Sequence, residues 1–124
     1  MFTRRILSVL GGASRFSLAG ARALHIEPSK ASITDAITKE KVLMFSKTHC
    51  PFCARVKEIF DVLDTKYEVM ELDTRDDGAE IQMLLLDITG QRTVPSVFIN
   101  GKHIGGCDSV MDLYAKSELV SILN

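Results

Sequence analysis

The sequence has few cysteines, no large excess of charge and no long hydrophobic run, and each shortage excludes a class of protein. No stretch of eighteen apolar residues occurs in the 124-residue chain, which excludes a transmembrane helix. Three cysteines are too few, and an odd number, for a secreted scaffold held together by disulfides. Fifteen basic against 16 acidic residues argue against a nucleic-acid binder that relies on bulk positive charge. What remains, 46% hydrophobic and 25% charged, is the composition of one globular domain.

Acidic residues are absent from residues 1–26, which carry Arg4, Arg5, Arg15 and Arg22 together with many small and hydroxylated residues. The remaining 98 residues hold 11 basic and 16 acidic side chains. This contrast is typical of an organelle-import presequence. We therefore expect residues 1–26 to direct a domain of residues 27–124 to the mitochondrion, with the matrix as its destination, and to be cleaved between Arg22 and Ser29. The alternatives are a disordered tail with accidental bias and, less well matched because arginines interrupt every apolar run, a secretory signal.

Hydrophobic periodicity divides residues 27–124 into short strands and amphipathic helices. A uniformly apolar run at 42–45 indicates a strand buried on both faces, and residues 67–72 and 97–99 indicate two more. Asn100-Gly101 is a strong hairpin signal and predicts a return strand at 103–104. Four helices are expected, the first capped by Ser29 or Ser32, the second over 51–63, the third from Asp76-Asp77 to Gly90, and the last over 110–123 with an interruption near 116–117.

Strands and helices alternate in this order, which predicts a compact α/β sandwich around a four-stranded mixed sheet. Two strand–helix–strand connections are long enough for right-handed crossovers, so we expect parallel strands there, followed by an antiparallel pair in the hairpin. Met70 and Met83 are expected to fill the core.

The clearest chemical motif is Cys50-Pro51-Phe52-Cys53, between the buried strand and the second helix. A thiol at a helix N-terminus is favoured as the thiolate by unpaired backbone N–H groups, and Lys47 adds positive charge nearby. Cys53 stands three residues on, on the same side of the helix, so it can attack a mixed disulfide formed on Cys50. We expect Cys50 to be the attacking thiol and Cys53 the resolving one.

Two other interpretations of the motif remain open. Half of a structural zinc site would need two further ligands, for which the candidates, without recognisable pairing, are Cys107 and the histidines His25, His49 and His103. Two ordinary core cysteines are the second alternative, although the surrounding residues are polar and turn-like.

From about Ser29 to Asn124 the chain resembles a glutaredoxin of the dithiol type. The resemblance rests on three motifs in the family's order, Lys47–Cys53, Thr93-Val94-Pro95 and Gly105-Gly106-Cys107-Asp108. It implies a thioredoxin-like three-layer α/β/α sandwich. Thioredoxin itself is disfavoured because its active-site motif contains tryptophan and a Gly-Pro pair, and this sequence has no tryptophan. Phe52 departs from the tyrosine that is more frequent in the family, so a phenolic hydroxyl is missing.

The resemblance also implies a groove for glutathione, which carries two carboxylates and one ammonium. By analogy, Lys47, Gln82 and Arg92 lie near the glycine carboxylate. Val94, before a proline that resembles the family's cis-proline, offers its backbone to the cysteinyl unit. Asp108 and the N–H groups after Gly106 hold the γ-glutamyl end. The complete expected set of glutathione-binding residues is Lys47, Phe52, Gln82, Arg92, Thr93, Val94, Pro95, Gly106, Cys107 and Asp108.

Several of these positions have simpler interpretations. Gln82 and Arg92 fit plain solvated positions, and Asp108 is expected to be a helix N-cap as well as a ligand contact. Cys107 fits a small apolar residue beside the groove, the alternative being a regulatory thiol favoured by its helix-start position. His49 is expected to be a solvent-facing neighbour of Cys50.

Two functions follow from this resemblance. The first is a monomeric glutathione-dependent thiol–disulfide oxidoreductase that acts on glutathionylated or disulfide-bonded proteins, with glutathione as co-substrate, no resident metal, no nucleic-acid partner and no membrane insertion. The alternative is a homodimer that holds a [2Fe-2S] cluster through one Cys50 from each chain and two glutathiones. Pro51 disfavours the alternative, because cluster binders of this kind usually carry serine or glycine there.

Overall fold

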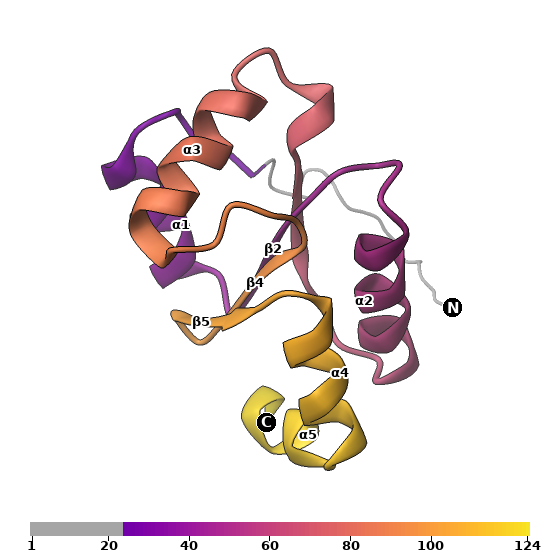
Figure 1. The fold of residues 1–124 in the computed structure, drawn as a ribbon. Helices are drawn as coiled ribbons and strands as arrows, with labels where there is room; N and C mark the ends of the chain where they lie inside the picture. Colours follow the sequence, from indigo (N-terminus) through magenta and orange to yellow (C-terminus); the bar gives the residue numbers. More distant parts are fainter. Residues whose placement is uncertain (1–23) are drawn as a thin grey trace, which may run out of the picture.

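The computed structural model describes residues 24–124, and residues 1–23 of the expected presequence lie outside this range. The described chain folds in the order α1 (Lys30–Lys39), β2 (Val42–Ser46), α2 (Pro51–Val62), β3 (Glu68–Glu71), the short 3₁₀ helix η2 (Leu72–Thr74), α3 (Gly78–Thr89), β4 (Ser96–Ile99), β5 (Lys102–Gly105), α4 (Cys107–Ala115) and α5 (Glu118–Leu123). Figure 1 shows the sheet between two layers of helices, with α1 and α3 on one side and α2, α4 and α5 on the other. The predicted three-layer α/β/α sandwich is confirmed.

The sheet has four strands in the order β3-β2-β4-β5 and is mixed, as predicted. Strand β2 pairs parallel with β3, Leu43 opposite Glu68, and antiparallel with β4, Met44 opposite Val97. The expectation of a second parallel crossover, through α3, is therefore wrong. The length of a connection permits a crossover but does not fix the direction of the next strand. After α3 the chain enters β4 at the end of the sheet where β2 and β3 leave it, so β4 runs antiparallel to both.

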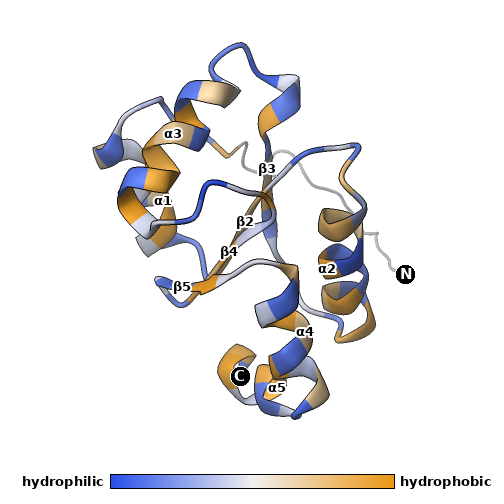
Figure 2. Ribbon diagram, in the orientation of Figure 1, coloured by the Kyte–Doolittle hydropathy of each residue, from blue (hydrophilic) through white to orange (hydrophobic). Residues whose placement is uncertain are grey.

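Strand β2 is apolar throughout because its two faces serve two separate cores. Val42 and Met44 join the buried cluster beneath α2, α4 and α5, whereas Leu43 and Phe45 join the cluster beneath α1 and α3. Figure 2 shows the corresponding hydrophobic colour along the central strands. Met70 is buried as predicted, but Met83 on α3 is 58% exposed, so its assignment to the core is wrong.

Most helix and turn signals act as predicted. The Ser29 hydroxyl accepts the Ser32 N–H at 3.2 Å and caps α1, and Gly90 ends α3 with a φ of 81°. Asn100 and Gly101 both have positive φ, as a tight hairpin requires. Among residues 24–124, none of the helices has the length and apolar character needed to cross a membrane.

The folded unit includes residues before Glu27. Ile26 is only 1% exposed and packs in the cluster beneath α1 and α3. Its carbonyl accepts a hydrogen bond from the Arg75 guanidinium at 2.6 Å. Arg75 also binds the Asp77 carboxylate through two hydrogen bonds, so Asp77 precedes α3 without capping it with its side chain.

Candidate active site

The loop from β2 to α2 places Cys50 as the N-cap of α2, the position that the sequence predicts. Its N–H donates to the Lys47 carbonyl at 3.1 Å, and its extended backbone leads into Pro51, which needs no N–H in the first helical turn. The Cys53 N–H donates to the Cys50 sulfur at 3.4 Å. One orphan donor of the helix terminus therefore stabilises negative charge on that sulfur.

The two thiols of the motif differ in acidity. Burial raises the pKa of the Cys50 thiol, but hydrogen bonds from Cys53 and Phe52 and the charge of Lys47 outweigh it, so the pKa is lowered from its ordinary value. Cys53 is fully buried, and that burial raises its pKa. Cys50 is partly exposed and is the more acidic of the two thiols, and Cys53 lies buried behind it. This asymmetry suits attack by Cys50 and resolution by Cys53.

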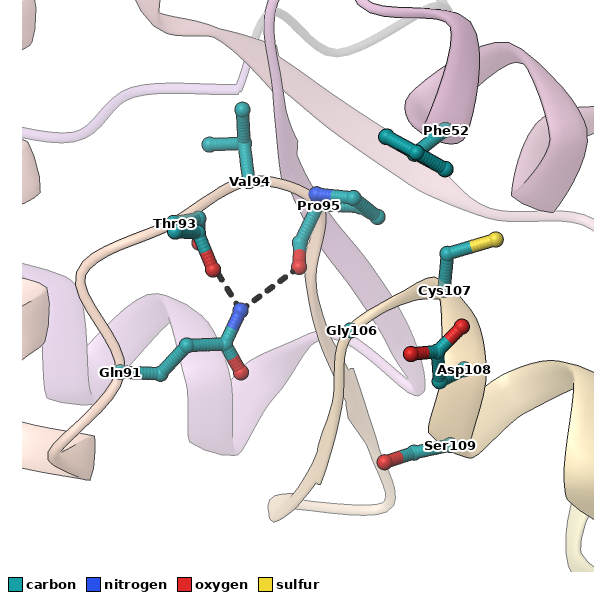
Figure 3. A pocket seen from close by; sticks show the side chains of 9 residues that line it. All are labelled: Phe52, Gln91, Thr93, Val94, Pro95, Gly106, Cys107, Asp108 and Ser109. Atoms are coloured by element: carbon teal, nitrogen blue, oxygen red, sulfur yellow. Dashed lines mark hydrogen bonds between the residues drawn. The ribbon is translucent and has the colours of Figure 1, made fainter.

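A groove of about 480 Å³ opens between the start of α2, the loop before β4 and the start of α4. The Cys50 sulfur lies at its edge, 4.0 Å from the Val94 carbonyl. The Val94-Pro95 peptide bond is cis, as the resemblance implies. Figure 3 shows the residues that line the groove, which are Phe52, Gln91, Thr93, Val94, Pro95, Gly106, Cys107, Asp108 and Ser109.

Seven of the ten expected glutathione-binding residues line this groove, and Lys47, Gln82 and Arg92 do not. The Gln82 amide donates to the Arg92 carbonyl at 2.7 Å, which links α3 to the loop before β4. Lys47 bears on the site through its charge, which helps to lower the pKa of Cys50.

Gln91 and Ser109 also line the groove, although the sequence analysis did not identify them. The Gln91 side-chain amide donates to the carbonyls of Thr93 and Pro95, each at 2.8 Å, and so braces the loop on both sides of Val94 (Figure 3). The sequence does not indicate that Gln91 braces this loop, because its partners are backbone carbonyls, which every residue carries.

The start of α4 forms the opposite wall of the groove. Gly106, not Asp108, is the N-cap of α4, so the expectation of a capping Asp108 is wrong; its carboxylate is exposed in the first turn. Cys107 is 8% exposed, and its sulfur lies 3.6 Å from that of Met111. Burial raises the pKa of Cys107, which supports the interpretation as a small apolar residue over that of an activated thiol.

Asp73 in η2 anchors the loop that precedes Cys50, and the sequence analysis missed it. Its carboxylate accepts the Thr48 N–H at 3.0 and 3.1 Å, the Thr48 hydroxyl and the His49 ring at 3.1 Å. The Thr48 hydrogen bonds lower the pKa of Asp73 to about 2. His49 is largely exposed, as expected for a solvent-facing neighbour of Cys50.

No group of three or more His, Cys, Asp or Glu side chains placed to hold a metal ion occurs among residues 24–124. What the geometry does provide is an activated thiol, a buried partner thiol and an adjoining groove. On a thioredoxin-like fold, this site defines a thiol–disulfide oxidoreductase.

Comparison with known proteins identifies the family. The glutaredoxin family model matches residues 42–104, and the chain belongs to the glutaredoxin family. It is 53% identical to a glutaredoxin of Ricinus communis over 72% of this chain and 87% of that protein, and 51% identical to Glutaredoxin-C2 of Arabidopsis thaliana over 72% and 80%. A crystal structure of a buckwheat glutaredoxin–glutathione complex is 49% identical, covers 76% of this chain and 86% of its own, and has a TM-score of 0.74.

Proposed function

We propose that this glutaredoxin reduces protein–glutathione mixed disulfides and protein disulfides, with glutathione as the reductant. The observation that carries the proposal is the Cys50 sulfur, which accepts the Cys53 N–H at the edge of the groove between Val94 and Asp108. The buckwheat relative at 49% identity is a complex with glutathione, which supports glutathione as the ligand of this groove.

The groove has chemistry that suits each part of glutathione. The Val94 carbonyl lies 4.0 Å from the Cys50 sulfur, and the backbone there suits an extended peptide as a strand edge does. The exposed Asp108 carboxylate suits the ammonium of the γ-glutamyl unit, and the N-terminus of α4 suits its carboxylate. A glutathione held in this way presents its sulfur to Cys50.

With a glutathionylated protein, the Cys50 thiolate attacks the glutathione sulfur of the mixed disulfide. The protein thiolate leaves and takes up a proton, and Cys50 is left in a disulfide with glutathione. The thiolate of a second glutathione then attacks the glutathione sulfur of this adduct, which releases glutathione disulfide and restores the Cys50 thiolate. Cys53 takes no part in this route.

With a protein disulfide, Cys50 attacks one sulfur and becomes linked to the protein. Cys53 loses its proton, attacks the Cys50 sulfur and expels the protein dithiol, which leaves a Cys50–Cys53 disulfide. Two glutathiones reopen this disulfide and leave as glutathione disulfide. The closeness of the two cysteines gives Cys53 a high effective concentration for this step.

The experiment is a glutathione-coupled assay of the full chain on a glutathionylated protein and on a protein disulfide. Replacement of Cys50 by serine should abolish both activities. Replacement of Cys53 by serine should keep or increase deglutathionylation, because the internal disulfide is a side branch, and should remove most protein-disulfide reduction. Equal loss of both activities in the Cys53 variant would contradict the two-route proposal.

The dimer that holds a [2Fe-2S] cluster is the second candidate. Cys53 and Cys107 are buried, so Cys50 is the thiol that each chain could offer, and the other protein ligand would come from a second copy. An absorption spectrum separates the candidates: visible absorption that disappears when glutathione is removed would favour the cluster carrier.

A mitochondrial destination is also proposed, on the basis of the arginine-rich, acid-free residues 1–26. A related rice protein, Glutaredoxin-C4, is named as chloroplastic and is 49% identical, so a plastid is the competing destination.

A further inference from the structure

A second, more apolar groove lies between α2 and α4, outside the glutathione groove. Its volume is about 410 Å³, and it is lined by Arg55, Glu58, Ile59, Val62, Met111, Tyr114 and Ala115. Several large apolar side chains here are open to solvent: Val62 is 67% exposed, Tyr114 41% and Met111 37%. Thiol exchange at Cys50 uses none of them.

This α2–α4 groove begins beside the reaction site. Met111, which lines this groove, lies one turn of α4 beyond Cys107, which lines the glutathione groove, and the two sulfurs are 3.6 Å apart. Phe52, which is 61% exposed, lines the glutathione groove together with Cys107 (Figure 3). Helices α2 and α4 both begin at the site and lie side by side in Figure 1.

We infer that the α2–α4 groove binds an apolar side chain of the substrate protein near its reactive cysteine. The inference rests on the proposed function, because only a protein substrate has a chain that must leave Cys50 across the neighbouring surface. A largely apolar groove next to the reaction site, lined also by Arg55 and Glu58, suits an extended amphipathic segment.

The geometry of α2 gives the separation between the substrate cysteine and the substrate residue that reaches the α2–α4 groove. Arg55 and Val62 lie five and twelve residues beyond Cys50, which corresponds to about 8 and 18 Å along α2. An extended chain covers about 3.3 Å per residue, so the groove is reached about two to five residues from the substrate cysteine. The preferred substrates therefore carry a large apolar residue at that separation.

The test compares synthetic peptides that are glutathionylated on a single cysteine and carry either leucine or serine four positions away, with leucine placed before the cysteine in one peptide and after it in another. With the full chain, kcat/KM for one leucine peptide should exceed that for its serine counterpart by about five- to tenfold, the gain expected when an open groove buries about half of one leucine side chain. Equal rates for leucine and serine in both positions would overturn the inference.

Two variants link the preference to the groove. Val62→Lys should remove the leucine preference, and a lysine at the end of α2 is compatible with the helix. Val120→Lys is the matched control, since Val120 is 42% exposed on α5 and outside the groove; it should keep the preference. Tyr114→Ser should also weaken it. A preference unchanged in the Val62 and Tyr114 variants would place the leucine contact elsewhere.

The disulfide of glutathione with 2-mercaptoethanol is too small to reach the α2–α4 groove, so its turnover should be the same in all of these variants. Absence of its turnover in the unmodified chain would contradict the proposed function, not the groove. Sedimentation tests a second copy as the occupant: a dimer that Val62→Lys dissociates, without any leucine preference, would overturn the inference.

Discussion

The Thr48 N–H donates to both carboxylate oxygens of Asp73, at 3.0 and 3.1 Å, across 25 residues of sequence. The Thr48 hydroxyl binds the same carboxylate. Thr48 lies two residues before Cys50, so this contact from η2 fixes the approach of the chain to the N-terminus of α2. The nucleophile is thus positioned by a residue that belongs to neither the motif nor the groove.

Replacement of Asp73 by alanine should therefore reduce the activity that depends on the position of Cys50. We expect kcat/KM to fall by about tenfold, because misplacement of a reacting group costs rate steeply. Asp73→Asn keeps one oxygen for the Thr48 N–H, so its kcat/KM should lie between those of the unmodified chain and Asp73→Ala. The measurement is the coupled assay together with a thermal melt; an Asp73→Ala protein that folds and retains full activity would contradict this role.

The low pKa of Asp73 also predicts a pH dependence of stability. A carboxyl whose pKa is lowered on folding stabilises the folded state above its ordinary pKa and loses that contribution as the pH falls through its folded value, here about 2. The difference in unfolding free energy between the unmodified chain and Asp73→Asn should therefore shrink below pH 4, as followed by denaturant titration. A constant difference down to pH 2 would contradict the assignment.

The lowered pKa of Cys50 predicts its reactivity. Because the thiolate is the reactive form, alkylation of Cys50 should reach its full rate at a lower pH than that of free cysteine. Cys53 and Cys107 should be alkylated more slowly at every pH near neutrality, since burial raises the pKa of both thiols. Mass spectrometry of digested protein after brief alkylation resolves the three sites. A midpoint for Cys50 at or above that of free cysteine would contradict the prediction.

The burial of Ile26 predicts where the folded domain begins. A chain of residues 24–124 should be more stable than one of residues 27–124 by about 2 kcal/mol, the contribution of one buried isoleucine. The longer chain also keeps the Ile26 carbonyl that binds Arg75. Urea unfolding of the two chains measures the difference, and equal midpoints would show that Ile26 adds nothing to the fold.

The targeting proposal predicts that residues 1–26 carry a fused reporter into mitochondria. Replacement of Arg4, Arg5, Arg15 and Arg22 by glutamine should leave the reporter in the cytosol. Fluorescence microscopy with organelle markers distinguishes the destinations. Import that is indifferent to the arginines, or delivery to plastids, would contradict the proposal.

The sequence predicted those features that depend on neighbouring residues. The spacing of Cys50 and Cys53, Pro51 at a helix start and the Asn100-Gly101 turn each act within one or two turns of chain. The antiparallel direction of β4 and the hydrogen bond from the Thr48 N–H to the Asp73 carboxylate depend on how distant segments meet. The spacing of apolar residues placed Met83 in a helix but did not show that its side chain faces solvent.

A single turnover of the Cys53→Ser protein with a glutathionylated peptide shows which sulfur of the mixed disulfide Cys50 attacks. If the Cys50 thiolate attacks a glutathione held in the groove between Val94 and Asp108, mass spectrometry should find glutathione on Cys50 and the peptide released as a free thiol. The peptide itself on Cys50, or glutathione on Cys107, would contradict attack by Cys50 on a glutathione bound in this groove.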